Sequence, residues 1–311
     1  MKKVLITGGA GFIGSHLCDR LVEQGDEVIV LDNLTSGNLG NLAGVIDQIT
    51  FIEDDVTRVL DHRDAFEGVT HIVHLAALIS GYDSLNEPDD YLAQNVGALL
   101  RVLELARDLG GVRISFASSS TVYGNSVEPI KLETQRPEPI TMYALTKLSG
   151  EHLLEMYRPL YNYSYVALRF FNVYGPRQSP NHPYANVTCK FSQAAALGAG
   201  IKLFGDGQQT RDFVYVDDVV NSLLVTMDGA PSNLYNVGNG EDHSILKLID
   251  TLEGIVEKPF EIERCDPWPN DIRKIIADTE RLTSETSWRA TTSLRDGLAR
   301  TVEFFQAEEQ A

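Results

Sequence analysis

The stretch TGGAGFIGSHL (7–17) decides the fold, because it places Gly8, Gly11 and Gly14 three residues apart between a strand signal and a helix signal. The strand signal before it is KVLIT (3–7), a short β-rich run. Glycines at such a junction allow a tight turn and close approach of the backbone, so that a pyrophosphate can lie against the N-terminus of the following helix. The G-x-x-G-x-x-G spacing is one residue wider than the usual dinucleotide fingerprint. We therefore predict a dinucleotide-binding turn here.

Strand and helix signals alternate after this turn. Apolar runs that indicate strands lie at 26–32, 49–56, 71–77, 112–120 and 163–171. Apolar residues recur at helical spacing between them, as at 92–103. Strands that are apolar nearly throughout are typical of a parallel sheet covered by helices on both faces. The pattern predicts an α/β fold, a Rossmann-type doubly wound parallel sheet.

The pattern loosens after Phe171. The stretch 172–184 is irregular and rich in Pro, Asn and Tyr, and helix signals return near 244–256 and 295–306. The sequence has no internal repeat, and no flexible linker separates the two parts. We therefore expect a smaller mixed α/β C-terminal substrate domain that packs on the first.

Composition excludes several classes of protein. The 311 residues carry a formal net charge of −18, with 44 Asp and Glu against 26 Lys and Arg, so a general nucleic-acid-binding surface is not expected. No apolar run approaches the roughly 20 residues of a membrane-spanning helix. The apolar run after the two N-terminal lysines is too short for a signal peptide. We expect a cytoplasmic protein that binds neither nucleic acid nor membrane.

The cysteines and histidines give no sign of a disulfide or a metal site. Cys18, Cys189 and Cys265 are odd in number, far apart and without a C-x-x-C motif, and the seven histidines show no metal-ligand spacing. We expect no metal, and we predict that all three cysteines are buried.

An acidic residue at the end of the second strand indicates the cofactor. Asp32 lies 18 residues after Gly14, where a carboxylate can accept hydrogen bonds from the adenosine ribose. The same carboxylate would repel a 2′-phosphate, so NAD is favoured over NADP. The run DDV (54–56) ends the third strand, where an acidic side chain can meet the adenine amino group. Capping of the following helix is the alternative role for such a residue.

Eight motifs, in order over about 270 residues, make the chain similar to one family. They are TGGAGFIG (7–14), DNL (32–34), HLAA (74–77), SSSTVYG (118–124), YALTK (143–147), RFFNVYGPRQ (169–178), RDFVYVDDV (211–219) and DIRKIIAD (271–278). On these motifs the chain resembles the extended short-chain dehydrogenase/reductase family, in its NAD-dependent sugar epimerase/dehydratase branch. The resemblance implies an NAD-binding Rossmann domain at 1–170, to which the chain returns around 213–238, and a sugar-nucleotide-binding domain at 171–311.

Tyr143 and Lys147 lie four residues apart at the start of a predicted helix, so their side chains share one face. Free tyrosine has a pKa of about 10, but an ammonium one turn away and the positive charge of oxidised nicotinamide would both favour the phenolate. The resemblance implies that Tyr143 is the catalytic base and that Lys147 also holds the nicotinamide ribose. Ser119 matches the family's active-site Ser/Thr, whose hydroxyl can bond the reacting oxygen and relay its proton. Ser118 and Ser120 are its neighbours.

The resemblance also implies which residues bind each ligand. For the cofactor NAD they are Gly8, Gly11, Phe12, Ile13, Gly14, Asp32, Asn33, Asp55, Val56, Leu75, Ala76, Ala77, Asn95, Tyr143 and Lys147. For the sugar nucleotide they are Ser119, Asn172, Leu203, Phe204, Arg211 and Arg273. Asn172 and the two arginines match residues that contact the diphosphate, and arginine suits bidentate contacts with phosphate. Leu203 and Phe204 lie in a segment similar to the one that packs on the uracil, with strand core as the alternative role.

The two positions after Ser119 argue against dehydration. Dehydratases of this family carry Asp-Glu directly after the active-site hydroxyl, and the related UDP-glucuronate decarboxylases typically have Glu at the second place. This chain has Ser120 and Thr121 there, which supply no carboxyl group. Oxidation and re-reduction at one carbon is the simplest reaction left. We therefore expect a UDP-hexose 4-epimerase that acts on UDP-glucose and UDP-galactose through bound NAD.

Three alternatives stay open. Ile275 matches a place where epimerases vary between small and large residues to admit or exclude an N-acetyl group, so N-acetyl sugars remain candidate substrates. UDP-glucuronate 4-epimerases carry a similar serine-rich stretch but usually have Thr where this chain has Asn172. A non-catalytic NAD-binding redox sensor belongs to a different class; such proteins commonly lose the Tyr or the Lys, and this chain keeps both.

The resemblance implies an oligomeric state as well. The family commonly forms homodimers through helices that correspond to 90–108 and 144–158, so a homodimer is expected.

Overall fold

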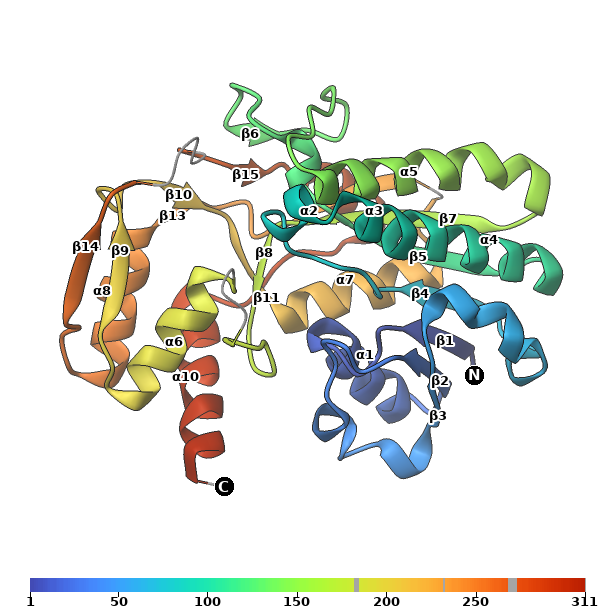
Figure 1. The fold of residues 1–311 in the computed structure, drawn as a ribbon, viewed down its shortest axis with the longest axis horizontal. Helices are drawn as coiled ribbons and strands as arrows, with labels where there is room; N and C mark the ends of the chain where they lie inside the picture. Colours follow the sequence, from blue (N-terminus) through green and yellow to red (C-terminus); the bar gives the residue numbers. More distant parts are fainter. Residues whose placement is uncertain (182–184, 232, 268–272, 311) are drawn as a thin grey trace.

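A seven-stranded sheet forms the centre of the molecule (Figure 1). The computed structural model describes residues 1–311 apart from 182–184, 232, 268–272 and 311. Neighbouring strands are parallel throughout, in the order β12-β7-β5-β4-β1-β2-β3. The strands are β1 (Lys3–Thr7), β2 (Glu27–Asp32), β3 (Thr50–Glu53), β4 (His71–His74), β5 (Arg113–Ser119), β7 (Ser164–Phe170) and β12 (Asn233–Val237). The predicted α/β fold with a doubly wound parallel sheet is confirmed.

Both faces of the sheet are buried, because successive residues of a strand point to opposite faces. In β1, Val4 and Ile6 join a hydrophobic cluster on one face, whereas Leu5 joins the cluster on the other face. This burial explains why the strands are apolar nearly throughout instead of alternating with polar residues.

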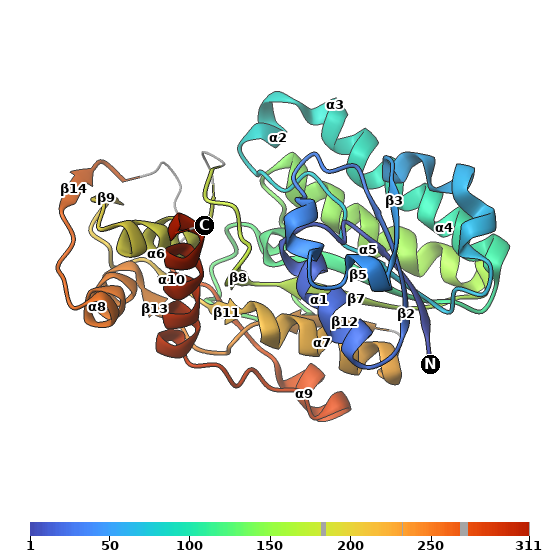
Figure 2. The same ribbon diagram turned by 90° about the horizontal axis from the view of Figure 1, so that it is seen from below.

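Helices cover the two faces in pairs. Helices α1 (Phe12–Glu23) and α7 (Val216–Asp228) lie side by side on the first face (Figures 1 and 2). Helices α4 (Ala98–Leu109) and α5 (Met142–Tyr161) lie side by side on the second face, next to the 3₁₀-helix η3 (Val56–Phe66). None of the helices, within the described part of the chain, has the length and apolar character that a membrane span requires.

The C-terminal part of the chain lies mainly at one end of the sheet (Figure 1). Its helices are α6 (Val187–Leu197), α8 (Ile245–Val256), α9 (Glu280–Thr286) and α10 (Leu294–Gln310). Parallel pairs join β8 (Asn172–Tyr174) to β11 (Phe213–Tyr215), β9 (Ile201–Phe204) to β14 (Ile262–Cys265), and β6 (Ile130–Lys131) to β15 (Ile276–Ala277). An antiparallel pair joins β10 (Thr210–Arg211) to β13 (His243–Ser244). The expected smaller mixed α/β part is confirmed, and its boundary at residue 171 stays a prediction.

Short helices complete the connections between these elements. They are η1 (Leu39–Leu42), η2 (Ile46–Gln48), α2 (Asp83–Asn86), α3 (Pro88–Tyr91), η4 (Leu92–Gly97) and η5 (Ser120–Tyr123). Of these, η4 is a π-helix that continues directly into α4.

Several sequence-based expectations need correction or fall outside the described residues. The helix signal at 92–103 begins as a π-helix, and the stretch 172–184, expected to be irregular, contains strand β8. Cys265 is half-exposed on β14, so the prediction that all three cysteines are buried is wrong for it. Residues 182–184 and the first two residues of the motif 271–278 lie outside the described part of the chain.

Helix α5 approaches strand β5 closely at a glycine. A Cβ at Gly150 would lie 2.4 Å from Phe116 Cζ and 3.1 Å from Leu99 Cδ2. Phe116 and Leu99 are both buried, so neither side chain can move away into solvent. The absence of a side chain at Gly150 therefore sets how near α5 lies to the sheet.

This contact predicts that Gly150→Ala destabilises the protein. Alanine favours a helix by about 1 kcal/mol over glycine, but overpacking against a buried ring costs about 1–3 kcal/mol. We expect a net loss of about 1 kcal/mol in the free energy of unfolding, measured by urea titration. Gly254→Ala in α8 is the matched control, because its Cβ would meet only the Arg295 side chain, at 3.4 Å. A stabilised Gly150→Ala protein would contradict the packing argument.

Candidate active site

The glycine turn between β1 and α1 forms a cradle of backbone. Gly8 has a φ of +77°, and a Cβ there would lie 2.7 Å from the amide nitrogen of Ala76. A Cβ at Gly14 would lie 2.2 Å from the carbonyl oxygen of Gly8, so a side chain at Gly14 would prevent this close approach of helix and turn. Helix α1 begins at Phe12 without a side-chain cap from Gly11, which leaves its first N–H groups for a pyrophosphate. The turn therefore fits a dinucleotide.

Asp32 lies beside this cradle at the end of β2. Its Oδ2 accepts a hydrogen bond from the Ala10 N–H at 2.9 Å, and its Oδ1 accepts one from the Leu34 N–H at 2.8 Å. A carboxylate has about four lone-pair sites, so both oxygens can still accept ribose hydroxyls. Asn33 is exposed next to it and donates its amide to Asp55 Oδ2 at 2.8 Å. This side of the cradle fits NAD, whose ribose carries no 2′-phosphate.

Asp55 takes the capping role at the start of η3. Its Oδ1 accepts hydrogen bonds from the Thr57 N–H at 2.9 Å and from the Thr57 hydroxyl at 2.6 Å. Val56 is 8 % exposed and packs on the core, and its contact with the cofactor stays a prediction. Residues 75–77 are half-buried where β4 ends, next to the glycine turn.

Asn95 lies in the π-helix η4 and joins it to two other segments. Its amide nitrogen donates to the Leu78 carbonyl and to Thr146 Oγ1, both at 3.0 Å, and its Oδ1 accepts the Leu78 N–H at 2.8 Å. Both amide hydrogens are thus used within the protein, so the expected cofactor contact would have to come from Oδ1. Since Thr146 precedes Lys147 on α5, this side chain helps to hold the start of that helix.

Tyr143, Lys147 and Ser119 come together between the start of α5 and the end of β5. The Tyr143 phenol lies close enough to the Ser119 hydroxyl for that hydroxyl to lower the Tyr143 pKa. Lys147 is buried, and its Nζ lies 5.8 Å from the Tyr143 ring centroid and 5.2 Å from that of Phe116. Thr141 caps the helix just before Tyr143 by accepting the Ala144 N–H at 3.1 Å. The structure thus brings the three predicted catalytic residues together.

The charges at this site differ from the sequence-based expectation. Burial raises the pKa of Tyr143 to about 12, and the nearby Ser119 hydroxyl offsets this only in part. Burial also lowers the pKa of Lys147 from 10.5 to about 8. We expected Lys147 and oxidised nicotinamide both to favour the phenolate; in the NAD-free protein the lysine does not lower the Tyr143 pKa, because both side chains are desolvated together. Lowering of the Tyr143 pKa then depends on the positive charge of oxidised nicotinamide.

The hydroxyls after β5 have distinct partners. Ser118 Oγ donates to Glu151 Oε1 at 2.5 Å, on the α5 side, whereas Ser119 Oγ accepts the Thr121 N–H at 3.2 Å and bonds the Thr121 hydroxyl at 2.9 Å. Ser118 is thereby committed to Glu151, and Ser119 is the serine that meets Tyr143. This geometry agrees with the choice of Ser119 over its neighbour.

Asp212 organises the predicted diphosphate side of the site. Its carboxylate is fully buried and accepts backbone N–H groups from 239–240 and Ala277 at 2.6–3.0 Å. Its carbonyl oxygen accepts the Asn172 side-chain amide at 3.1 Å, and Arg211 precedes it on β10. Burial raises the Asp212 pKa to about 6, although the three N–H groups act in the opposite direction.

A backbone hydrogen bond brings the segment that carries Arg273 beside the segment that carries Arg211. The Thr210 N–H donates to the Arg273 carbonyl at 2.9 Å, so both predicted diphosphate arginines lie at one strand end. The Arg273 guanidinium is exposed and pairs with Asp206 at 3.1–3.3 Å. A diphosphate would have to draw Arg273 away from this exposed ion pair, which contributes only about 0–1 kcal/mol.

Leu203 and Phe204 face different environments on β9. Leu203 is 1 % exposed and belongs to the core, so its side chain cannot pack on a base and that prediction is wrong for it. Phe204 is half-buried, as the alternation of side chains along a strand requires. Of the two residues, Phe204 stays the candidate for the base.

Sequence reasoning missed a buried ion pair behind the catalytic residues. Glu151 and Arg169 are both buried, and Arg169 Nη2 lies 2.7 Å from Glu151 Oε2. Two signals were present in the sequence. Glu151 lies one turn beyond Lys147, and Arg169 is a single charge in the apolar run 163–171.

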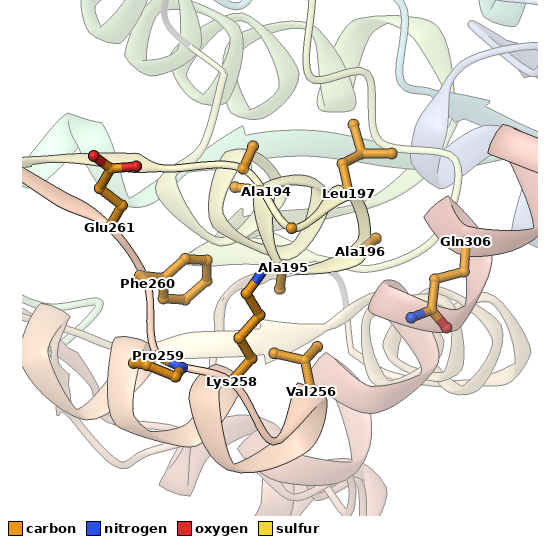
Figure 3. A pocket seen from close by; sticks show the side chains of 12 residues that line it. Ala194, Ala195, Ala196, Leu197, Val256, Lys258, Pro259, Phe260, Glu261 and Gln306 are labelled. Carbon is orange, nitrogen blue, oxygen red and sulfur yellow. The ribbon is translucent and has the colours of Figure 1, made fainter.

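A cavity of about 380 Å³ lies apart from these residues, between the ends of α6, α8 and α10 (Figure 3). Ala195, Val256, Phe260 and Gln306 are among its lining residues, and Lys258 extends across its wall. None of the predicted site residues lines it.

Comparison with known proteins places the chain in one family. The model described as "NAD dependent epimerase/dehydratase family" matches residues 4–238. UDP-glucose 4-epimerase of Mycolicibacterium smegmatis is 38% identical, over 99% of this chain and all of its own length. Among solved structures, UDP-N-acetylglucosamine 4-epimerase from Methanobrevibacter ruminantium has a TM-score of 0.95 at 33% identity, covering 99% of both chains. UDP-glucose 4-epimerase of Thermotoga maritima has a TM-score of 0.94 at 35% identity, again covering 99% of both. Proteins named as UDP-glucuronate 4-epimerases match as well, at 29–30% identity.

The buried ammonium predicts that Lys147→Met stabilises the NAD-free protein. The lowered pKa of Lys147, about 8 instead of 10.5, means that the folded state carries the charge at a cost below pH 8. We expect a gain of roughly 1–3 kcal/mol in the free energy of unfolding at pH 7. The unfolded lysine keeps its proton up to about pH 10.5, so the difference between the proteins shrinks as pH rises from 8 to 10.5.

Urea titrations of both proteins at several pH values in this range would measure the effect. Lys202→Met, which removes an exposed ammonium on β9, is the control and should show little difference at any pH. A Lys147→Met protein that is less stable than the wild type at pH 7 would contradict the argument.

Proposed function

Because the chain belongs to the NAD-dependent epimerase/dehydratase family, we propose that it is a UDP-hexose 4-epimerase that interconverts UDP-glucose and UDP-galactose. At the coarser level it is an NAD-dependent nucleotide-sugar 4-epimerase. This removes the alternative of a non-catalytic redox sensor. The observation that carries the proposal is the position of Tyr143 next to Ser119 and beside the buried Lys147, with no carboxylate at 120–121.

Each of these side chains has a task at the C4 hydroxyl of the sugar. NAD, when bound, supplies a hydride acceptor that can return the hydride to the same carbon. Tyr143 removes the hydroxyl proton as the hydride leaves, and returns it when the hydride comes back. Ser119 bonds the reacting oxygen and relays its proton. Lys147 holds the nicotinamide ribose and adds positive charge near the phenol.

The surroundings of Ser119 support epimerisation over elimination of water. Elimination needs a further acid and base, and Ser120 and Thr121 occupy the positions that would supply them. Thr121 instead forms hydrogen bonds with Ser119 Oγ through both its N–H and its hydroxyl. The hydroxyl group of Ser119 is thereby oriented within the site.

The diphosphate and the sugar set the substrate range. Asn172, Arg211 and Arg273 are our candidates to hold the diphosphate. In support, Asn172 bonds the carbonyl of Asp212, next to Arg211, and the Arg273 carbonyl accepts the N–H of Thr210; Phe204 is the candidate to pack on the base. Ile275, at the position that varies with N-acetyl acceptance, is 5 % exposed and packs in a cluster with Tyr123. The relatives divide among UDP-glucose, UDP-N-acetylglucosamine and UDP-glucuronate, so these three sugars form the test panel.

A product assay tests the substrate. The purified protein, with no added cofactor, is incubated separately with UDP-glucose, UDP-N-acetylglucosamine and UDP-glucuronate, and the products are separated by chromatography. We expect UDP-galactose from UDP-glucose at the highest kcat/KM. Conversion of UDP-glucuronate alone, or of UDP-N-acetylglucosamine alone, would contradict the proposed substrate and leave the reaction type unchanged.

Tyr143→Phe should abolish turnover and leave NAD binding intact. Loss of a general base typically costs about 10²–10⁴-fold in rate, so we expect kcat to fall by at least about 10³-fold. Bound NAD, measured after denaturation of the protein, should stay at the wild-type ratio. Tyr161→Phe, at the opposite end of α5, is the control. Activity within tenfold of the wild type in Tyr143→Phe would mean that another group is the base.

We also propose that the protein forms a homodimer through α5 and η4. Leu92, Leu145, Met156 and Leu160 expose apolar side chains there, where η4 packs against α5, one of the helices that cover the sheet (Figure 1). A second copy of the chain would bury these side chains from water.

The dimer proposal predicts that Met156→Glu yields monomers. A carboxylate on each copy would be buried at the interface without a partner, which disfavours association. Sedimentation velocity should give a dimer for the wild type and a monomer for the variant. Leu197→Glu is the matched control, because Leu197 is 46 % exposed on α6 and Met156 is 54 % exposed. A monomeric wild type, or dimeric Met156→Glu, would contradict the proposed interface.

A further inference from the structure

A buried ion pair joins α5 to β7 behind the proposed catalytic residues. Arg169 donates from Nε to Glu151 Oε1 at 2.8 Å and from Nη2 to Oε2 at 2.7 Å, which is a bidentate arrangement. Arg169 is 2 % exposed and Glu151 9 %. Both charges are therefore removed from water and satisfied mainly by each other.

The same pair contacts the segment that carries Ser119. Ser118 Oγ donates to Glu151 Oε1 at 2.5 Å, and Ser118 directly precedes Ser119 on β5. The Arg169 guanidinium lies 4.7 Å from the ring centroid of Tyr123, on the short helix that follows Ser119. One ion pair thus touches residues on both sides of the active-site serine.

Helical spacing links Glu151 to Lys147 and Tyr143, the two proposed catalytic residues besides Ser119. Glu151 lies one turn beyond Lys147 and two turns beyond Tyr143, so the three side chains lie on one side of α5. A bond between Glu151 and the end of β5 therefore fixes both the rotation of α5 and its position along its own axis. Those two parameters set where Tyr143 lies relative to Ser119.

Apolar packing alone would not fix the rotation of α5 or its position along its own axis. Around Gly150 and Leu154, α5 is already held against the sheet by buried hydrophobic contacts, which are non-directional. A buried ion pair is weak evidence for stability, since well-packed apolar residues of similar volume often replace one at no loss. Directional hydrogen bonds from a planar guanidinium, in contrast, impose geometry.

We propose that Glu151 and Arg169 are positioning residues, which hold Tyr143 and Lys147 in register with Ser119 and so determine kcat, while the fold does not depend on them. This inference rests on the proposed function, because it assigns the pair to the reaction at Tyr143. Neither residue needs to touch the substrate.

The test replaces both charges at once, so that no unpaired charge is left buried. The double variant Glu151→Leu/Arg169→Met is purified with its bound NAD, and its melting temperature, NAD content, kcat and KM are compared with the wild type. We expect a melting temperature within about 5 °C of the wild type, unchanged NAD content, KM within about threefold, and kcat lower by about 10- to 100-fold.

Two controls isolate the effect. Arg101→Met/Glu104→Leu removes an exposed ion pair on the neighbouring helix α4 and should leave kcat unchanged. Arg169→Lys in an otherwise wild-type protein keeps the charge but loses the bidentate contact, so its kcat should fall as well. Full activity of Arg169→Lys would overturn the geometric argument.

Other outcomes would also overturn the inference. A folded double variant with kcat within twofold of the wild type would show that the pair does not position the site. A double variant that fails to fold, or melts far below the wild type, would show that the pair serves stability.

A second readout does not require turnover. The pH titration of the Tyr143 phenol, followed by ultraviolet absorbance against the same protein carrying Tyr143→Phe, should shift upward in the double variant as the phenol moves away from the Ser119 hydroxyl. An unchanged titration would contradict the inference. A wild type that converts no UDP-sugar would contradict the proposed function instead, and the titration would still test this inference.

Discussion

The seating of α5 against β5 is the constraint on which the site depends. Gly150 lets the helix backbone approach the Phe116 ring, and the ammonium of Lys147 lies over the same ring at 5.2 Å. The ion pair of Glu151 with Arg169 then adds direction to this apolar contact. Because Tyr143 lies in the first turn of the helix that these contacts hold, its distance to the end of β5 follows from them. Contacts of α5 up to two turns beyond Tyr143 therefore set the positions of the Tyr143 phenol and the Lys147 ammonium.

This seating shields the half-buried phenol of Tyr143 and the buried ammonium of Lys147 from water together, at a cost to the NAD-free protein. The pKa of Tyr143 is raised to about 12 and that of Lys147 lowered to about 8, both through burial. Each shift opposes the charged form that the reaction requires. A site of this kind would suit oxidised nicotinamide, since the positive charge of its ring would favour the phenolate. Stability is reduced where function requires charge, a trade-off common at active sites.

The sequence was sufficient for features that depend on local pattern. Gly8, Gly11 and Gly14 after an apolar run predicted the dinucleotide turn, and the spacing of Tyr143 and Lys147 predicted a shared helix face; the structure has both. Features that depend on register or burial were not predictable in the same way. The pairing of β9 decides that Leu203, and not Phe204, faces the core. Desolvation, which no sequence motif records, raises the pKa of Tyr143. The Glu151–Arg169 pair joins residues 18 positions apart, on a helix and a strand. Sugar specificity was not predictable either, because Ile275 packs in a buried cluster and relatives of similar identity are named for different sugars.

The account depends on oxidised nicotinamide lowering the pKa of one phenol. The direct measurement is the pH titration of Tyr143 with NAD⁺ bound and with NADH bound, read from the ultraviolet difference spectrum between wild type and Tyr143→Phe. The account predicts that the Tyr143 phenolate forms at least about two pH units lower with NAD⁺, because only the oxidised ring carries the positive charge. Equal titration midpoints in the two redox states would contradict it.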